Sequence, residues 1–226
     1  MEILANRIMK KNIIFDLGGV FIDLDMNLMQ QKLLALGADP SAFFVKSSAE
    51  NSSTICNGLS VSHIITNYQI GRMTTDEFVN IILSHCKQGT TAKQVIEAWN
   101  SCLVQLPEER LQMVKELRTK GFSTFLLSNI NDLHWVYIEH EFFGKDGFRT
   151  DDLFDGIFLS HEVHMTKPDP KIYQLVLKQI GCKADDCLFI DDSLPNAEAA
   201  QNEGIASEWL DLTKENVTEL IGRVEK

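Results

Sequence analysis

Four short apolar segments are spread along the chain, and each of them ends at a polar residue. They are apolar on both faces, without the alternation that marks a strand with one solvated face. Strands of this kind need cover on two sides, as they have in a parallel sheet. The pattern predicts buried strands at residues 12–16, 122–128, 156–160 and 187–191.

Helices with recognisable start and stop signals are predicted between these strands. One begins after Pro107 with two acidic residues and ends before Gly121, which suits the helix dipole and a left-handed C-cap. Others are predicted at residues 170–181, 194–204 and 213–224, the last capped by Thr213. Alternating strands and helices predict an α/β fold with a doubly wound parallel sheet.

Residues 26–105 break this alternation. They contain no recognisable buried strand, but several stretches such as residues 74–83 place apolar residues at helical spacing. We therefore predict a sheet domain, residues 1–25 and 106–226, interrupted by an all-helical cap domain, residues 26–105. Three apolar residues of the cap are expected to belong to its own core: Phe78, Ile82 and Trp99.

The polar residues at the strand ends are the first candidates for chemistry, because the carboxyl ends of parallel strands meet at one edge of the sheet. Asp16 follows the first strand and precedes Gly18-Gly19, a loop that lets a substrate approach the backbone. Its carboxylate can serve as a nucleophile; the alternative is a turn-forming aspartate that bonds to its own loop.

Asp191 and Asp192 end another strand. Three clustered carboxylates repel one another unless they are protonated or bridged by a cation with oxygen ligands, for which Mg²⁺ is the natural choice. The alternative makes one of the pair a helix N-cap.

Two further segments offer groups that suit phosphate. Ser128 and Asn129 end the second strand before a helical stretch, where a hydroxyl, an amide and backbone N–H groups can bind phosphate oxygens, or else act only as caps. Lys167 lies in a loop stiffened by two prolines, where a fixed ammonium suits a transferring phosphoryl group; the alternative is a solvated surface lysine. His161 and His164 stand nearby, but two histidines without a carboxylate partner make a poor zinc site, so we interpret them as loop residues at the sheet edge.

Charge and composition narrow the classes of partner. The net charge of −11 leaves no surplus of basic residues for a nucleic-acid backbone. No apolar run is long enough to span a membrane, and the first residues lack the apolar block of a secretory signal. Five cysteines without a C-x-x-C pair are interpreted as reduced thiols. We expect a cytoplasmic protein that binds neither nucleic acid nor membrane; its oligomeric state is not predicted.

In order and spacing, four segments resemble the four motifs of the haloacid dehalogenase superfamily of hydrolases. The segments are Phe15-Asp16-Leu17-Gly18-Gly19-Val20, Leu126-Leu127-Ser128-Asn129, Lys167-Pro168 and Ile190-Asp191-Asp192-Ser193. The resemblance implies a Rossmann-like sheet with a mobile cap and a phosphatase acting on a small phosphorylated metabolite. It implies that Asp16 attacks phosphorus to form an aspartyl-phosphate, that Ser128 and Lys167 hold the phosphoryl oxygens, and that Asp16, Asp192 and the carbonyl of Gly18 bind Mg²⁺, with Asp191 as outer support.

Gly18 departs from the pattern of the family, in which most phosphatases carry a second aspartate at this position to protonate the leaving oxygen. Losing a positioned proton donor costs about 10²- to 10⁴-fold unless the leaving group is good. A branch resembling α-glucose-1-phosphate phosphatase shares the Asp-Leu-Gly pattern, and its anomeric phosphate is a comparatively good leaving group. Two alternatives stay open: a haloalkanoic acid dehalogenase, which works without metal, and a non-catalytic protein that binds a sugar phosphate.

Overall fold

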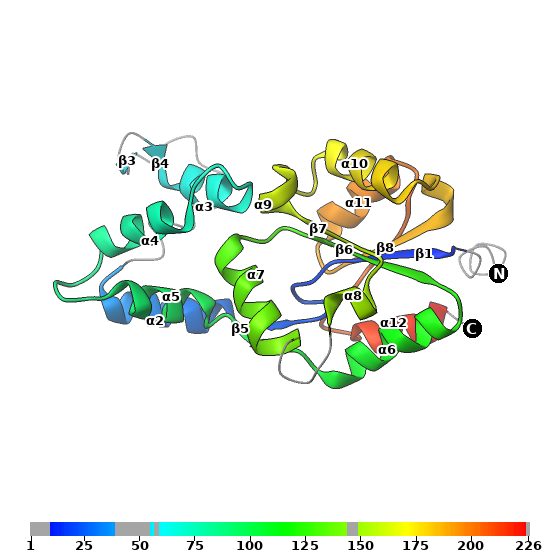
Figure 1. The fold of residues 1–226 in the computed structure, drawn as a ribbon, viewed down its shortest axis with the longest axis horizontal. Helices are drawn as coiled ribbons and strands as arrows, with labels where there is room; N and C mark the ends of the chain where they lie inside the picture. The colour runs from blue at the N-terminus through cyan, green and yellow to red at the C-terminus, as the bar shows by residue number, and fades with distance from the viewer. Residues whose placement is uncertain (1–9, 39–54, 57–58, 144–148, 225–226) are drawn as a thin grey trace.

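A five-stranded parallel sheet forms the centre of this computed structural model, which describes residues 10–38, 55–56, 59–143 and 149–224. Its order is β7-β6-β1-β8-β9, so that β1, the first strand of the sheet in the chain, lies in the middle, as expected of a doubly wound Rossmann-like fold (Figure 1). The strands are β1 (Asn12–Phe15), β6 (Ser123–Ser128), β7 (Gly156–Leu159), β8 (Cys187–Asp191) and β9 (Ala206–Trp209).

Helices cover both faces of this sheet. Side chains alternate along β1: Ile13 and Phe15 pack into one apolar cluster, and Ile14 packs into the other. The first face is covered by α6 (Glu108–Thr119), α8 (Thr150–Leu153) and α12 (Val217–Val224), the second by α10 (Pro170–Ile180) and α11 (Leu194–Asn202) (Figure 1). The α/β fold predicted from the apolar strands is confirmed. The remaining short elements of this part are α7 (Asp132–Ile138), the π-helix Glu139–Phe143, α9 (Ser160–Val163) and the 3-10 helix Ala184–Asp186.

The segment between β1 and α6 projects from the sheet domain as a group of helices (Figure 1). It enters through β2 (Asp23–Leu24) and returns through β5 (Leu103–Gln105), and these two strands pair antiparallel. Between them lie α2 (Met26–Leu36), α3 (Val61–Gln69), α4 (Thr75–Ser84) and α5 (Ala92–Asn100), with two-residue strands β3 (Ile55–Cys56) and β4 (Leu59–Ser60). Phe78, Ile82 and Trp99 are buried, as predicted. The division at residues 25 and 105 stays a prediction.

Three features of the structure differ from the sequence interpretation. β9 was not predicted, because the segment Ala206–Trp209 has no continuous apolar run. The last helix begins at Val217 rather than after Thr213, because the side chain of Asn216 accepts the backbone N–H groups of Thr218 and Glu219 and caps it. The cap is not purely helical, since it includes the β3–β4 pair and contributes β5 to the ribbon at its base.

The cap also touches the sheet domain outside that ribbon, at α7 and at the sheet edge near Ser160. The indole of Trp99 in α5 stacks on the ring of His134 in α7, with centroids 5.4 Å apart. At the end of α3, the carbonyls of Gln69 and Ile70 lie 2.7 Å from Ser160 Oγ and 2.8 Å from His164 Nδ1. His164 therefore joins the cap to the sheet edge, which agrees with its interpretation as a structural loop residue.

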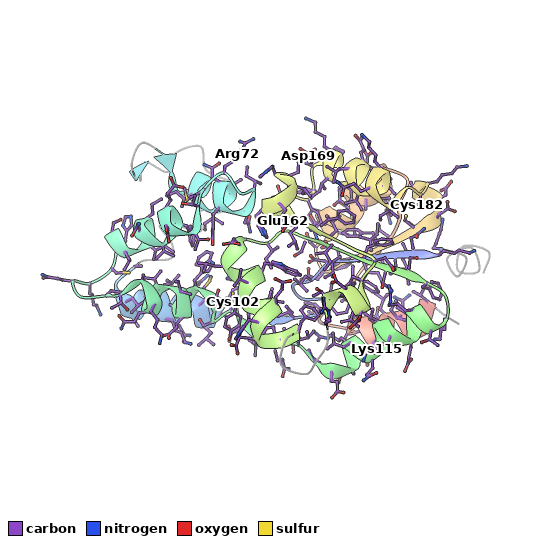
Figure 2. The ribbon with its side chains drawn as sticks, viewed as in Figure 1. Arg72, Cys102, Lys115, Glu162, Asp169 and Cys182 are labelled. Atoms are coloured by element: carbon purple, nitrogen blue, oxygen red, sulfur yellow. The ribbon has the colours of Figure 1, made fainter. Side chains whose placement is uncertain are left out.

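No helix among the described residues combines the length and the apolarity that a membrane-spanning segment needs. Four of the five cysteines have described side chains, and all four are free thiols: Cys86, Cys102, Cys182 and Cys187. Cys102 and Cys182 lie far apart, at the two positions labelled in Figure 2. Cys56 lies outside the described side chains.

Candidate active site

Asp16 lies directly after β1, the middle strand, at the carboxyl edge of the sheet. Its backbone N–H bonds to the carbonyl of Ile190 in β8, which fixes it beside the next strand end. The loop that follows depends on Gly19, whose φ is +75° and where a Cβ atom would lie 2.4 Å from Oδ2 of Asp192. The absence of a side chain at residue 19 therefore lets the loop pass close to the acidic pair.

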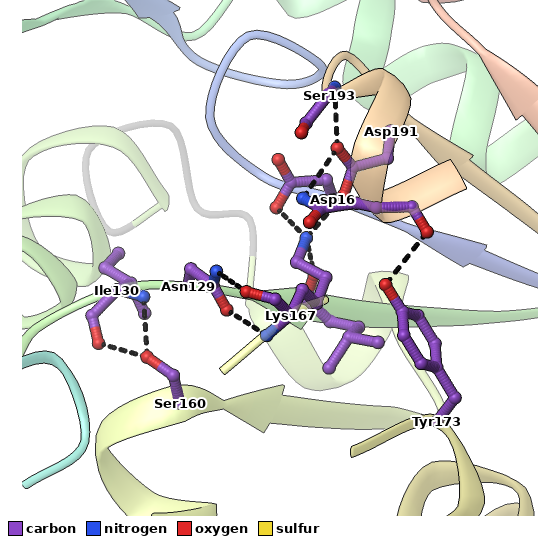
Figure 3. A network of polar contacts seen from close by, with 10 residues as sticks. Asp16, Asn129, Ile130, Ser160, Lys167, Tyr173, Asp191 and Ser193 are labelled. Atoms are coloured by element: carbon purple, nitrogen blue, oxygen red, sulfur yellow. Dashed lines mark hydrogen bonds and ion pairs between the residues drawn. The ribbon is translucent and has the colours of Figure 1, made fainter. Parts of the chain in front are cut away.

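Lys167 joins three segments that are far apart in the sequence (Figure 3). Its buried ammonium donates to Asp16 Oδ1, Asp191 Oδ2 and the carbonyl of Leu127, each at 2.7 Å. Burial alone would lower the pKa of Lys167, but the charges of Asp16 and Asp191 reverse this effect and raise it. The lysine is a buried, charged group, and the solvated-surface alternative is excluded.

Asp191 is fully buried and held from two sides. Its Oδ1 accepts the backbone N–H of Ser193 at 2.8 Å, and both of its oxygens lie 3.1 Å from Asn196 Nδ2 (Figure 3). The carboxylate thus fixes the start of α11 and the position of Lys167. These hydrogen bonds hold the Asp191 carboxylate in one position behind Lys167.

The three carboxylates of Asp16, Asp191 and Asp192 offer oxygens that all lie within 4.8 Å of one another. Burial is the largest cause that raises the pKa of Asp16, and a nearby Asp191 adds to it while Lys167 opposes it. Burial, followed by the charge of Asp191, also raises the pKa of Asp192. One ammonium does not balance three carboxylates, and hard oxygen ligands suit a divalent cation, so the residues present fit Mg²⁺.

Asn129 holds the lysine loop in place. Its Oδ1 accepts the backbone N–H of Lys167 and its Nδ2 donates to the carbonyl of the same residue, both at 2.8 Å (Figure 3). Ser128, which is 3% exposed, lines the same cavity as Asp16 and Lys167. The structure thus brings together the predicted residues Asp16, Gly18, Ser128, Asn129, Lys167 and Asp192 around one cavity, with Asp191 behind it.

This cavity has a volume of about 200 Å³ and two chemically different ends. The charged cluster and Ser128 form one end. The amides of Asn129 and Asn196 and the imidazole of His134 also line the cavity. The rest of the wall is apolar and consists of Leu17, Ile22, Leu24, Leu103, Ile130 and Ile138. Leu24 and Leu103 come from the β2–β5 ribbon, so the base of the cap contributes to the wall.

The hydrogen bonds of His134 fix its tautomer. Asn131 Oδ1 accepts the backbone N–H of His134, so Asn131 Nδ2 faces ring atom Nδ1, which lies 3.2 Å away and acts as an acceptor. Ring atom Nε2 then carries the hydrogen and donates to the carbonyl of Trp99 at 3.2 Å. Burial lowers the pKa of His134 to about 4. The ring is neutral at pH 7, and both of its nitrogens are engaged.

We expect His134 to make folding stability depend on pH. As the pH falls from 7 to 4, the unfolded chain binds a proton near pH 6.5, whereas the folded chain binds it only near pH 4. The stability present above pH 6.5 is therefore lost on acidification, by about 2 to 3 kcal/mol from this residue. Urea unfolding of His134→Gln at several pH values should show this part of the slope missing. His140→Gln, at an exposed histidine, is the control for loss of a histidine as such. A slope for His134→Gln equal to that of the wild type would contradict the assignment.

Neither of the two acids that follow Gly18 in the sequence reaches the cavity wall. Asp23 pairs with Arg110 Nη2 at 2.7 Å and accepts from Gln105, and Asp25 caps α2 through Leu28 N–H at 2.9 Å. Neither is among the residues that line the cavity. Within the described part of the chain, the position of a missing acid at Gly18 is not filled by these neighbours.

Sequence reasoning missed Asn196, His134 and the apolar wall. Asn196 had a recognisable signal, since it is an amide in the first turn of the helix that follows Asp191-Asp192. His134 ends a Leu-Ser-Asn-x-Asn-x-Leu-His run, residues 127–134, that is similar to one in the α-glucose-1-phosphate phosphatase branch, but the run assigns it no place in the cavity. Leu103 had no signal, because its approach depends on how the cap packs against α7. His161 Nδ1 lies 3.0 Å from the carbonyl of Ile130, which supports its interpretation as a residue that shapes the sheet edge.

Comparisons with known proteins agree with this geometry. Residues 10–204 match the family described as haloacid dehalogenase-like hydrolase. The chain is 26% identical over 196 residues to the D-ribitol-5-phosphate phosphatase of Bacteroides thetaiotaomicron, covering 87% of this chain and 89% of that protein. It is 37% identical over 102 residues to the sesquiterpene phosphatase astK of Aspergillus oryzae, covering 44% of this chain and 48% of that protein. A crystal structure of a HAD family enzyme of Bacteroides thetaiotaomicron, in complex with magnesium and inorganic phosphate, superposes with a TM-score of 0.81 at 30% identity, covering 93% of this chain and 98% of that one.

Proposed function

Because this chain belongs to the haloacid dehalogenase-like hydrolase family, we propose that it is a magnesium-dependent phosphatase that hydrolyses a small phosphate monoester through an aspartyl-phosphate at Asp16. The observation that carries the proposal is the convergence of Asp16, Lys167 and the acidic pair on one cavity. A nucleophile, a fixed cation and a site for a divalent cation around one small space suit phosphoryl transfer, whose catalysis consists mainly of positioning and charge stabilisation.

Each residue has a proposed role. The carboxylate of Asp16 attacks phosphorus, and the ammonium of Lys167 orients that carboxylate and balances charge on the phosphoryl oxygens. Ser128 donates its hydroxyl to a phosphoryl oxygen, and Asn129 keeps Lys167 in place through its backbone. Water then hydrolyses the aspartyl-phosphate. Covalent capture divides one displacement into two easier ones.

Asp16, Asp192 and the backbone carbonyl of Gly18 would hold Mg²⁺, with Asp191 supporting the site from behind. When bound, the cation supplies positive charge for the phosphoryl oxygens and relieves the repulsion among the carboxylates. A crystal structure of the HAD family enzyme cited above contains magnesium and phosphate together, which supports this choice of ion.

The names of the two phosphatases to which the chain is similar support a small organic phosphate and differ in the rest of the substrate. One is named for a polyol phosphate and the other for a sesquiterpene. The resemblance to the α-glucose-1-phosphate phosphatase branch implies a sugar phosphate, so sugar phosphates are included among the substrates to be assayed.

A non-catalytic sugar-phosphate-binding protein is the second candidate, and the glycine at residue 18 is the observation that favours it. The alternative of a metal-free dehalogenase is less well supported, because three clustered carboxylates without a cation are electrostatically unfavourable. Release of phosphate from p-nitrophenyl phosphate separates these possibilities. We expect release with Mg²⁺ and none after EDTA; no release from p-nitrophenyl phosphate or from a panel of sugar phosphates would favour the binder.

Magnesium binding is expected to stabilise the folded protein through the acidic cluster. At a Mg²⁺ concentration about 100 times the Kd, the free energy of unfolding should rise by about 2.7 kcal/mol. The variant Asp192→Asn should lose this increase, as measured by urea unfolding with and without Mg²⁺. The matched change Asp186→Asn, in the exposed 3-10 helix before β8, should keep it. An equal response in wild type and Asp192→Asn would remove Asp192 from the metal site.

A further inference from the structure

The cavity also indicates what the rest of the substrate is. Building on the function proposed above, we propose that the substrate is an apolar ester of phosphate whose leaving oxygen departs as a stable anion, of the aryl or phenolic class, rather than the phosphate of a polyol or a simple alcohol. Two independent observations carry this proposal: the apolar wall and the lack of a proton donor beside the site of attack.

The cavity wall beyond the charged cluster has few groups that could form hydrogen bonds with the hydroxyls of a substrate. Ile22, Ile130 and Ile138 are buried aliphatic side chains, and Leu24 and Leu103 complete that side. The polar side chains beside this wall are engaged with the protein. His134 Nδ1 accepts from Asn131 and its Nε2 donates to the carbonyl of Trp99. The ring therefore offers a substrate no nitrogen that is not already engaged. The amide of Asn129 holds the backbone of Lys167, and that of Asn196 donates to Asp191. Hydroxyl groups placed there would lose their hydrogen bonds to water without replacement.

Among the described side chains that line the cavity, Asp192 is assigned to the cation and Ser128 to a phosphoryl oxygen, and the other candidate proton donors are engaged elsewhere. The three hydrogens of the Lys167 ammonium are directed at Asp16, Asp191 and Leu127. The imidazole of His134 has both nitrogens engaged. Gly18, next but one after the attacking residue, has no side chain. The leaving group must therefore depart without protonation, which favours an oxygen of low basicity.

The chemical step balances without an added acid. A carboxylate oxygen of Asp16 forms a bond to phosphorus while the bond between phosphorus and the ester oxygen breaks, and the electron pair leaves with that oxygen. A phenolic oxygen has a pKa near 10 and is stable as an anion, whereas an alkoxide is about as basic as hydroxide, with a pKa near 16 for its conjugate acid. The phenolate takes its proton later from water. The second step also lacks a base at residue 18, so aspartyl-phosphate should accumulate and give a burst of phenol.

The loop can accept the missing acid, which makes the inference testable by substitution. The backbone of Gly18 is not in the left-handed region, and a Cβ atom there would lie 3.0 Å from Leu24 Cδ1. That contact is the end of a flexible side chain, which is 43% exposed and can turn away. Gly18→Asp places a carboxyl beside the site, and Gly18→Asn is its matched control without a titratable proton.

Three substrates separate the two parts of the proposal when kcat/KM is measured with Mg²⁺. Phenyl phosphate and benzyl phosphate are both apolar but differ in the basicity of the leaving oxygen. Benzyl phosphate and ribitol 5-phosphate both release an alkoxide but differ in polarity. For the wild type we expect kcat/KM for phenyl phosphate to be at least about 10²-fold higher than kcat/KM for benzyl phosphate. We expect kcat/KM for benzyl phosphate to be about 10²-fold higher than that for ribitol 5-phosphate.

Gly18→Asp should lower the ratio of kcat/KM for phenyl phosphate to kcat/KM for benzyl phosphate by about 10²-fold, whereas Gly18→Asn should leave this ratio as in the wild type. Equal rates for phenyl and benzyl phosphate in the wild type would overturn the leaving-group part, as would equal ratios in the two variants. Preference for ribitol 5-phosphate over benzyl phosphate would overturn the apolar part. If neither phenyl phosphate nor p-nitrophenyl phosphate releases phosphate in a magnesium-dependent way, the proposed phosphatase function itself fails.

Discussion

Asp16→Asn is expected to lower phosphate release by at least about 10⁴-fold, because the amide cannot form the covalent bond to phosphorus. The fold should persist. Asparagine has nearly the same size as aspartate, and its carbonyl oxygen can still accept from the Lys167 ammonium at the distance of 2.7 Å seen for Asp16. Burial also disfavours a charge at residue 16, so loss of that charge removes an unfavourable term.

Two measurements on the same sample check this expectation: steady-state release from p-nitrophenyl phosphate and urea unfolding without Mg²⁺. The free energy of unfolding should stay within about 1 kcal/mol of the wild type. Asp25→Asn is the matched control, since asparagine can also cap α2 and Asp25 does not line the cavity. Substantial activity in Asp16→Asn, with normal activity in the control, would remove Asp16 from its role.

Lys167→Met is expected to lower the free energy of unfolding by about 3 to 5 kcal/mol. The ammonium is buried and is bonded to two carboxylates that are themselves buried. Methionine fills a similar volume but leaves Asp16 and Asp191 without their common partner. An uncompensated buried charge is more damaging than the loss of an exposed ion pair, which contributes up to about 1 kcal/mol. Phosphate release should be lost as well.

Urea unfolding at pH 7 in EDTA measures the effect of Lys167→Met. Lys178→Met makes the same change at an exposed lysine of α10 and should stay within about 0.5 kcal/mol of the wild type. Mg²⁺ should restore part of the lost stability of Lys167→Met, because it returns positive charge to the cluster. A change below about 1 kcal/mol in EDTA would mean that the two carboxylates do not depend on Lys167.

The two variants act on atoms 2.7 Å apart and are expected to differ in kind. Loss of the negative charge at residue 16 affects the reaction, and loss of the positive charge at residue 167 affects both reaction and fold. This difference follows from the imbalance of the cluster, which holds one buried ammonium and three carboxylates. A site built only for stability would have balanced these charges.

The sheet and the charged end of the site could be predicted because both depend on local sequence. A strand buried on two faces is apolar along its buried part, as residues 13–15 are, and the residue after it must lie at the sheet edge. Asp16 and Asp191 are therefore brought together by topology alone. β9 has a mixed pattern instead, since Ser207 is buried and the indole of Trp209 is half exposed.

The apolar end of the cavity could not be predicted, because distant packing forms it. Leu24 and Leu103 pair in a ribbon although they are 79 residues apart in the sequence (103 − 24), and nothing in either segment specifies the other. On sequence alone, His134 is a polar residue near the start of a helix, and its position in the cavity wall cannot be inferred. Its neutral, fully bonded state depends on Trp99 of the cap and becomes clear only when both sides are in place. The residues that we propose to select the substrate therefore lie in the part of the cavity that local sequence patterns predict least well.

Chemical trapping of the phosphorylated protein tests the central claim most directly. A reaction with phenyl phosphate and Mg²⁺ is quenched in acid and treated with borohydride, which reduces an acyl-phosphate to an alcohol, and the peptides are then mapped by mass spectrometry. We predict a reduced side chain at residue 16 in the wild type and none in Asp16→Asn. A reduced residue elsewhere in the chain, or rapid turnover with an unmodified Asp16 peptide at every quench time, would contradict the account.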